Sequence, residues 1–156
     1  MNYSSGTVNR VIIIRLEDGD TLPAAIEEVA EREKISRAFC LLVGGIRDGV
    51  LVTGPDSADA LPVRPMTLPI DGVHEIHGVG MIFPDDAGKP RLHMHASLGR
   101  SGSSRTGCIR PGINVWKVGE VILVEISGTD AVRIKDPATG FDLLEPNGSG
   151  TKKGEL

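Results

Sequence analysis

Short apolar runs separated by turn-forming residues dominate this chain, and they predict a fold built mainly from β-strands. The first run spans residues 10–16 and holds the β-branched stretch Val11 to Ile14, as a strand covered on both faces does. The later runs occupy residues 38–43, 46–53, 66–70, 74–83, 91–98, 121–126 and 131–134. Because no helical pattern separates these later runs, they predict a largely antiparallel sheet.

One segment, residues 22–34, has the periodicity of an amphipathic helix instead. The apolar residues that recur at helical spacing are Leu22, Ile26, Val29 and Ala30. Charged residues fill the other side, while Thr21 is suited to cap the helix and Pro23 to its first turn. We therefore expect an α/β (α+β) fold in which a mainly antiparallel sheet packs on one amphipathic helix.

The segments between these elements carry turn signals. Residues 54–65 predict a proline-containing loop, and the pair Gly44-Gly45 predicts a bulge or a close backbone approach. The Gly/Ser-rich segment 99–107 has the backbone amides, hydroxyls and two arginines that an anion or phosphate cradle needs. It lacks the Gly-Lys-Ser/Thr ending of a phosphate-binding loop, and a flexible hairpin between two strands is the favoured alternative. Beyond Asp136 the pattern decays, and residues 146–156 are expected to form a flexible tail. A length of 156 residues with 40% hydrophobic content suits one domain with a single core.

Charge narrows the range of partners. The formal net charge is −4, and no run of basic residues is longer than the pair Lys152-Lys153. Nonspecific affinity for DNA comes largely from basic groups that displace counterions, so direct duplex binding by this chain is disfavoured.

Both cysteines are expected to be reduced, and Cys40, inside the apolar run 38–43, is expected to be a buried thiol. The first residues lack a charged segment followed by an apolar one, and no apolar run is long enough to cross a bilayer. We therefore expect a cytoplasmic protein with no membrane partner.

The motif His93-Met94-His95 is the most informative feature for function. On a strand, residues two apart point to the same face, so both imidazoles converge. A borderline-soft metal needs a third nitrogen or sulfur donor, and Cys108, past segment 99–107, is well placed to supply it from a neighbouring strand. The alternative is that the histidines lie on a polar strand face and Cys108 is merely small and buried.

Other residues are weaker candidates for chemistry. His74 and His77 are three residues apart and do not match a zinc-protease helix, which needs a spacing of four. Glu75 and His77 are candidates for a supporting acceptor or proton carrier beside the metal, or for solvated side chains. No serine nucleophile can be argued, so any enzyme activity would have to come from a metal. Arg100, Arg105 and Arg110 flank the proposed ligands and predict a basic rim for a small anion.

Several motifs resemble the PPC domain, the plant and prokaryote conserved domain also called DUF296. They are segments 15–19, 44–48 and 88–90, Gly72 with Glu75-Ile76, residues 93–96, and residues 106–109 with Gly112. The resemblance covers about residues 8–145, which we take as the domain. It implies a mainly antiparallel sheet wrapped round one helix and assembly as a homotrimer. A single helix also cannot cover both faces of so many strands, which makes another subunit the natural cover.

Prokaryotic members of that family commonly carry a His-x-His pair followed by a third histidine, which together look like a metal triad. Here the pair is His93 and His95, and the third position falls on Cys108. A thiolate is a softer donor than imidazole and favours zinc or a similar divalent transition metal. Such members are often labelled DNA-binding by analogy with plant proteins whose AT-hook binds the minor groove, but this chain has no Arg-Gly-Arg core of that motif.

Three functions follow as hypotheses. The leading one is a cytoplasmic homotrimer with a zinc-type site that acts as a binding or regulatory module. The second is a small metal-dependent hydrolase or lyase, in which an open zinc position activates water and Glu75 or a neighbouring histidine moves the proton. The third is a DNA-binding regulator that reads nucleic acid through a patch created by trimerisation.

Overall fold

The computed structural model describes residues 1–146, and they form one short helix and a set of antiparallel strands. In chain order the elements are β1 (Thr7–Leu16), β2 (Thr21–Leu22), α1 (Ala24–Arg32), β3 (Ala38–Pro55), β4 (Pro65–Pro84), β5 (Pro90–Arg100), β6 (Ser103–Cys108), β7 (Ile113–Ser127), β8 (Val132–Lys135) and β9 (Asp142–Glu145). The expected fold class, a mainly antiparallel sheet with one helix, is confirmed.

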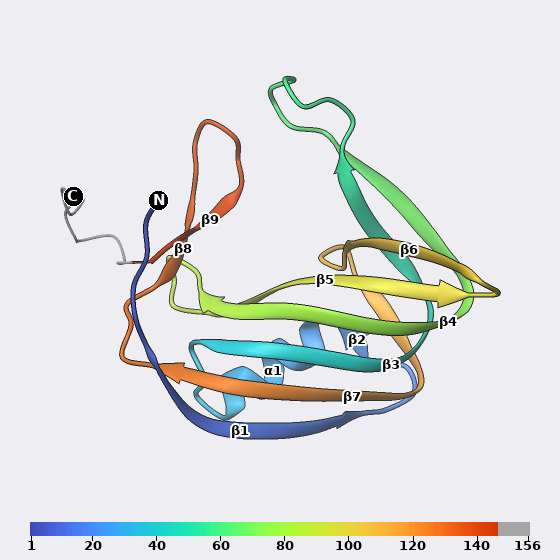
Figure 1. The fold of residues 1–156 in the computed structure, drawn as a ribbon, viewed down its shortest axis with the longest axis horizontal. Coiled ribbons are helices and arrows are strands. Elements are labelled where there is room, and N and C mark those ends of the chain that lie inside the picture. The colour runs from blue at the N-terminus through green and yellow to red at the C-terminus, as the bar shows by residue number, and fades with distance from the viewer. Residues whose placement is uncertain (147–156) are drawn as a thin grey trace.

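The main sheet has the strand order β1-β7-β3-β4-β5-β6, with β2 paired to β7, and every pairing is antiparallel. The sheet curves so that α1 lies in its concave side (Figure 1). Near its C-terminal end, β3 also pairs with β6 through Val52 and Cys108, which places the end of β6 beside β3. A separate hairpin of β8 and β9 packs against β4.

The core lies between the concave face of the sheet and the helix. Ile26 and Ala30 of α1 are completely buried against alternate residues of the long strands. The sheet contributes, among others, Cys40, Leu42, Ile82, Met94, Leu98 and Leu123. In β5 the even-numbered residues from Pro90 to Leu98 are buried and the odd-numbered residues face outward, because successive side chains of a strand point to opposite faces. This alternation decides on which side of the sheet each candidate functional residue lies.

Two pairs of predicted strands prove to be single long ones. Runs 38–43 and 46–53 join into β3, and runs 66–70 and 74–83 join into β4. Gly44 lies at a register irregularity of β3, and a Cβ there would be 2.5 Å from the carbonyl oxygen of Val118. The predicted close backbone approach is thus present, inside one strand instead of between two.

Other local predictions were wrong in whole or in part. Thr21 does not cap the helix: it pairs with Asn114 of β7, and its hydroxyl donates to the side chain of that residue at 2.8 Å. The helix begins after Pro23, which makes no side-chain cap. The predicted hairpin at segment 99–107 is present, but most of the segment is paired strand of β5 and β6, and the turn is confined to Ser101 (φ +50°) and Gly102 (φ +78°).

A strand lies beyond Asp136, where the sequence pattern does not indicate one. Residues 142–145 form β9, which pairs with β8 in the hairpin that follows the main sheet. Apart from Pro146, the expected tail at residues 146–156 lies outside the described residues. Within residues 1–146, no helix is long and apolar enough to cross a membrane.

Candidate metal centre

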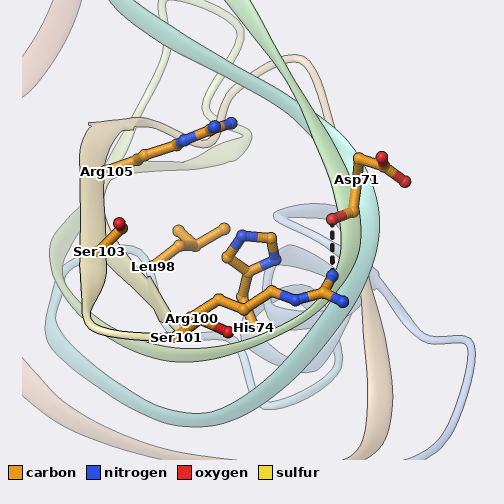
Figure 2. A pocket seen from close by; sticks show the side chains of 7 residues that line it. All are labelled: Asp71, His74, Leu98, Arg100, Ser101, Ser103 and Arg105. Carbon is orange, nitrogen blue, oxygen red and sulfur yellow. Dashed lines mark hydrogen bonds between the residues drawn. The ribbon is translucent and has the colours of Figure 1, made fainter.

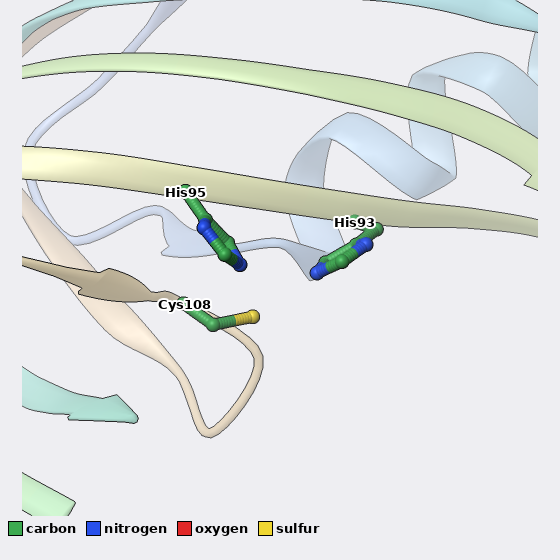
Figure 3. A group of neighbouring side chains, drawn as sticks. All are labelled: His93, His95 and Cys108. Atoms are coloured by element: carbon green, nitrogen blue, oxygen red, sulfur yellow. The ribbon is translucent and has the colours of Figure 1, made fainter. Parts of the chain in front are cut away.

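The three predicted ligands lie together on the outer face of the sheet (Figure 3). His93 and His95 are two residues apart on β5, and His95 is directly paired with Cys108 at the end of β6. Directly paired residues of neighbouring strands point to the same face, so the thiol meets the two imidazoles. Strand pairing therefore brings Cys108 to the histidines, although 12 residues separate it from His95 in the sequence.

The distances fit a shared metal ion. One ligand atom of each side chain, a ring nitrogen or Sγ, lies within 4.8 Å of the other two. The two imidazole rings are edge to face, with centroids 5.0 Å apart and an angle of 80° between their planes. Ligand atoms of a tetrahedral zinc ion lie roughly 3.5 Å apart, given bonds of about 2.0–2.3 Å, so small side-chain rotations would close the site. Cys108 is only 3% exposed, whereas both imidazoles face solvent.

The surroundings of His93 favour its neutral form. Partial burial of its ring lowers the pKa of His93, and the positive charges of Arg133, of His95 when protonated and of Arg110 lower it further. A neutral imidazole has the free lone pair that a metal requires, so the local charges favour a histidine that is ready to bind metal.

Arg133 of β8 is a buried cation that sequence reasoning missed. Its side chain is 8% exposed, its guanidinium carbon lies 5.9 Å from the centre of the Phe83 ring, and its Nε and Nη2 have no hydrogen-bond partner among residues 1–146. Burial lowers the pKa of Arg133, and the opposite charges of Asp142 and the Cys108 thiolate work against that shift. Run 131–134 is predicted as a strand, but nothing in its pattern indicates that the charge of Arg133 acts on His93.

The second cysteine lies in a different environment. Cys40 is fully buried on β3, and burial raises the pKa of its thiol to about 12. Both cysteines are free in the structure, and only Cys108 belongs to the group with the two histidines.

Glu75 and His77 lie on the same face of the sheet as the ligands but outside the group. On β4, Val79 is directly paired with His95, and His77 is paired with Ser97, so His77 is a diagonal neighbour of His95. Glu75 is two residues further along and pairs with Gly99. Both side chains are exposed. Their role as proton carriers or supporting acceptors stays a prediction.

The structure divides the three arginines expected to form a rim. Arg110 follows Cys108 closely, and its charge acts on His93. Arg100 and Arg105 lie on the other face of the β5–β6 pair, because they share the side of Leu98, which is directly paired with Arg105. They line a separate cavity.

Fold and site together define a class: a small protein in which a curved antiparallel sheet encloses one helix and presents a candidate nitrogen and sulfur metal group on its outer face. A sequence model of the Plants and Prokaryotes Conserved (PCC) domain, the PPC domain of the sequence analysis, matches residues 3–127. The chain belongs to this family. No curated protein is similar enough in sequence to count as a match.

Solved structures show the same fold. A metal-containing protein from Archaeoglobus fulgidus is 25% identical, covers 93% of this chain and 99% of its own, and superposes with a TM-score of 0.81. A plant- and prokaryote-conserved protein from Pyrococcus horikoshii is 24% identical over 93% of this chain and 97% of its own, with a TM-score of 0.80. A candidate DNA-binding protein from Ralstonia eutropha JMP134 is 20% identical over 85% and 89%, with a TM-score of 0.67.

Proposed function

We propose that this chain is a cytoplasmic, homotrimeric PPC-domain protein that holds a zinc-type ion with His93, His95 and Cys108 and acts as a binding or regulatory module. The grouping of two imidazoles and one thiol within 4.8 Å carries the proposal. The similarity to a protein described as metal-containing, from Archaeoglobus fulgidus, supports it.

The donor set favours zinc or a similar divalent transition metal. Imidazole and thiolate are borderline and soft ligands, which zinc accepts in tetrahedral geometry, whereas magnesium and calcium require oxygen ligands. Within residues 1–146, no carboxylate or further histidine joins the three. The three residues would therefore hold the ion and leave one position for a ligand from outside the group.

Metal analysis of the purified protein tests the centre. We expect up to one zinc-like ion per chain, and we expect the double variant His93→Ala/His95→Ala to lose it. Cys108→Ser should weaken binding, whereas Cys40→Ala, a change to a thiol outside the group, should leave the metal content unchanged. Affinity should drop as pH falls through the imidazole range, because protons compete with the metal. Unchanged metal content in the double variant would refute the site.

The outer face of the sheet supports the proposed homotrimer. Direct strand pairing forms a row across neighbouring strands that reads Ile13, Ile122, Leu41, Val79, His95 and Cys108. The first four side chains are apolar and between 40% and 81% exposed, so the candidate ligands lie at the edge of an uncovered apolar face. An apolar surface of this kind is typical of a protein interface.

Analytical ultracentrifugation tests the assembly. We expect a trimer at micromolar concentration, and we expect Leu41→Asp to give smaller species because it places a charge in the apolar row. Leu61→Asp is a matched control, since Leu61 is exposed in the loop between β3 and β4. A stable wild-type monomer would refute the trimer.

The alternative function is a small metal-dependent hydrolase or lyase. It is favoured by the exposure of both imidazoles, which leaves the open position accessible to a substrate. Zinc-dependent hydrolysis of an activated ester that is abolished by His93→Ala/His95→Ala and slowed by Glu75→Gln would favour the enzyme. Binding of metal without such turnover would favour the binding module.

A further inference from the structure

A cavity on the concave side of the β5–β6 hairpin is lined by two arginines. Its volume is about 370 Å³, and its lining residues are Asp71, His74, Leu98, Arg100, Ser101, Ser103 and Arg105 (Figure 2). Arg105 is paired with Leu98, whose side chain points to the opposite face from His95. The cavity and the metal centre therefore lie on opposite faces of the same pair of strands.

The first guanidinium of the cavity is held in place by backbone. Nη1 of Arg100 donates a hydrogen bond to the main-chain oxygen of Asp71 at 2.9 Å. A Cβ at Gly72 would be 1.8 Å from this Nη1, so a larger residue there would displace the guanidinium from its present position. Because Arg100 bonds to a carbonyl and not to a carboxylate, its charge is not neutralised by that contact.

The second guanidinium, that of Arg105, makes no ion pair within residues 1–146. Asp71 is the one acidic residue of the lining, and its carboxylate points away from the cavity (Figure 2). Two guanidinium groups thus line one concave site without a carboxylate between them. An arrangement of this kind attracts an anion, and guanidinium groups bind the oxygens of phosphate and carboxylate especially well.

Neutral groups complete the lining. His74 is 8% exposed, and its Nδ1 donates to the main-chain oxygen of Gly72 at 2.8 Å. Nε2 of the neutral ring is then an acceptor, so His74 shapes the lining but supplies no donor to an anion. Ser101 and Ser103, on either side of the tight turn, add two hydroxyl groups. The two guanidinium groups and the two hydroxyl groups therefore offer donors from several directions, which suits a tetrahedral oxyanion better than a planar one.

We propose that this cavity binds a small oxyanion of the phosphate class, with Arg100 and Arg105 as its cationic contacts. The site is independent of the metal centre. Phosphate in this role is either the free ion or the phosphoryl group of a small metabolite, and the lining residues recognise the chemistry that the two share.

Titration of the full-length protein with inorganic phosphate in the presence of EDTA tests the site. We expect saturable binding that Arg105→Gln weakens about tenfold or more, since a charge-assisted hydrogen bond is lost. Arg105→Lys should retain part of the affinity. Arg110→Gln removes the same charge on the metal side and should leave phosphate binding unchanged. The double variant His93→Ala/His95→Ala should also bind phosphate normally, which separates this test from that of the metal centre.

Two further ligands distinguish the possible chemistries. Acetate should bind at least tenfold more weakly than phosphate, and a small sugar phosphate should bind at least as tightly as the free ion if the cavity serves a metabolite. Equal loss of phosphate binding in Arg105→Gln and Arg110→Gln would overturn the proposal, because it would show a general effect of net charge. Absence of saturable phosphate binding by the wild type, or acetate binding as tight as phosphate binding, would overturn it as well.

Discussion

Replacing Arg133 by Met should stabilise the metal-free protein. The arginine places two donors, Nε and Nη2, in a buried position without a partner among residues 1–146. A buried polar group without a hydrogen bond costs about 1–3 kcal/mol, more when it is charged. Methionine has a similar length, keeps apolar contact with Phe83 and gains a sulfur–aromatic contact worth about 0.3–1.5 kcal/mol.

Two losses oppose this gain. The cation–π contact of Arg133 with Phe83, at 5.9 Å, is worth about 0.5–2 kcal/mol, and the attraction to Asp142 disappears as well. The balance is a net gain of about 1 kcal/mol, which corresponds to a rise in Tm of roughly 2–4 °C for a chain of this size. The same substitution should raise the pKa of His93, because it removes a nearby positive charge.

Thermal unfolding followed by circular dichroism in EDTA measures the first effect, and NMR titration of the His93 ring measures the second. Arg133→Lys is the control: it keeps a buried charge and should not stabilise the protein. A fall in Tm of several degrees in Arg133→Met, with no change in the His93 titration, would show that Arg133 has a favourable partner and does not act on His93. That outcome would refute both predicted effects of Arg133.

Three further predictions concern the backbone, pH and DNA. Gly44→Ala should destabilise the fold by about 2–3 kcal/mol in chemical denaturation, since its Cβ would lie 2.5 Å from a backbone oxygen. Gly99→Ala, whose Cβ would be 3.9 Å from its nearest neighbour, should cost little, and equal effects of the two changes would count against the close approach. Metal-free protein should lose stability as pH falls below about 6.5, because the unfolded state protonates His93 more readily than the folded state does, and His93→Gln should flatten this slope. Fluorescence anisotropy should detect no duplex DNA binding tighter than about 10 μM at about 150 mM salt, and submicromolar, sequence-dependent binding would refute this.

Net charge opposes duplex binding by the single chain and by the proposed trimer alike. A net charge of −4 per chain becomes −12 in a trimer (3 × −4) and repels a polyanion within a Debye length of roughly 8 Å. The Ralstonia eutropha protein described as a DNA-binding candidate is 20% identical to this chain, which establishes a shared fold. Arg100 and Arg105 line a concave cavity, which suits a single oxyanion better than the many phosphate contacts that tight duplex binding usually requires.

The sequence predicted the strand content and the grouping of the three candidate ligands, because strand periodicity and the pairing of neighbouring strands determine both. His93 and His95 share a face through the two-residue repeat of a strand, and the antiparallel return of β6 brings Cys108 beside them. The fusion of the predicted runs into β3 and β4 was missed, because Gly44 and Gly72 interrupt the apolar pattern without ending the strand. A side chain at either position would meet a close neighbour, the backbone oxygen of Val118 at Gly44 and the guanidinium of Arg100 at Gly72.

The side of the sheet on which each arginine lies could not be read from sequence proximity. Arg100, Arg105 and Arg110 all lie near the ligands along the chain, but the face of a strand changes with every residue and the direction of the chain reverses at the turn of Ser101 and Gly102. Arg133, in contrast, lies 40 residues from His93 in the sequence but acts on its pKa. The hairpin that carries Arg133 has no distinctive sequence pattern, so this effect could not be predicted.

The β5–β6 pair thus carries both proposed sites with one set of strand pairings. Odd-numbered residues of β5 carry the imidazoles on the outer face, next to the apolar row that we propose as the subunit interface, and even-numbered residues support the arginine-lined cavity on the inner face. A shift of one residue in this pairing would exchange the two faces and destroy both sites together. Substitutions that keep the register but alter one face should affect one site alone, which is why Arg105→Gln and His93→Ala/His95→Ala can be tested independently.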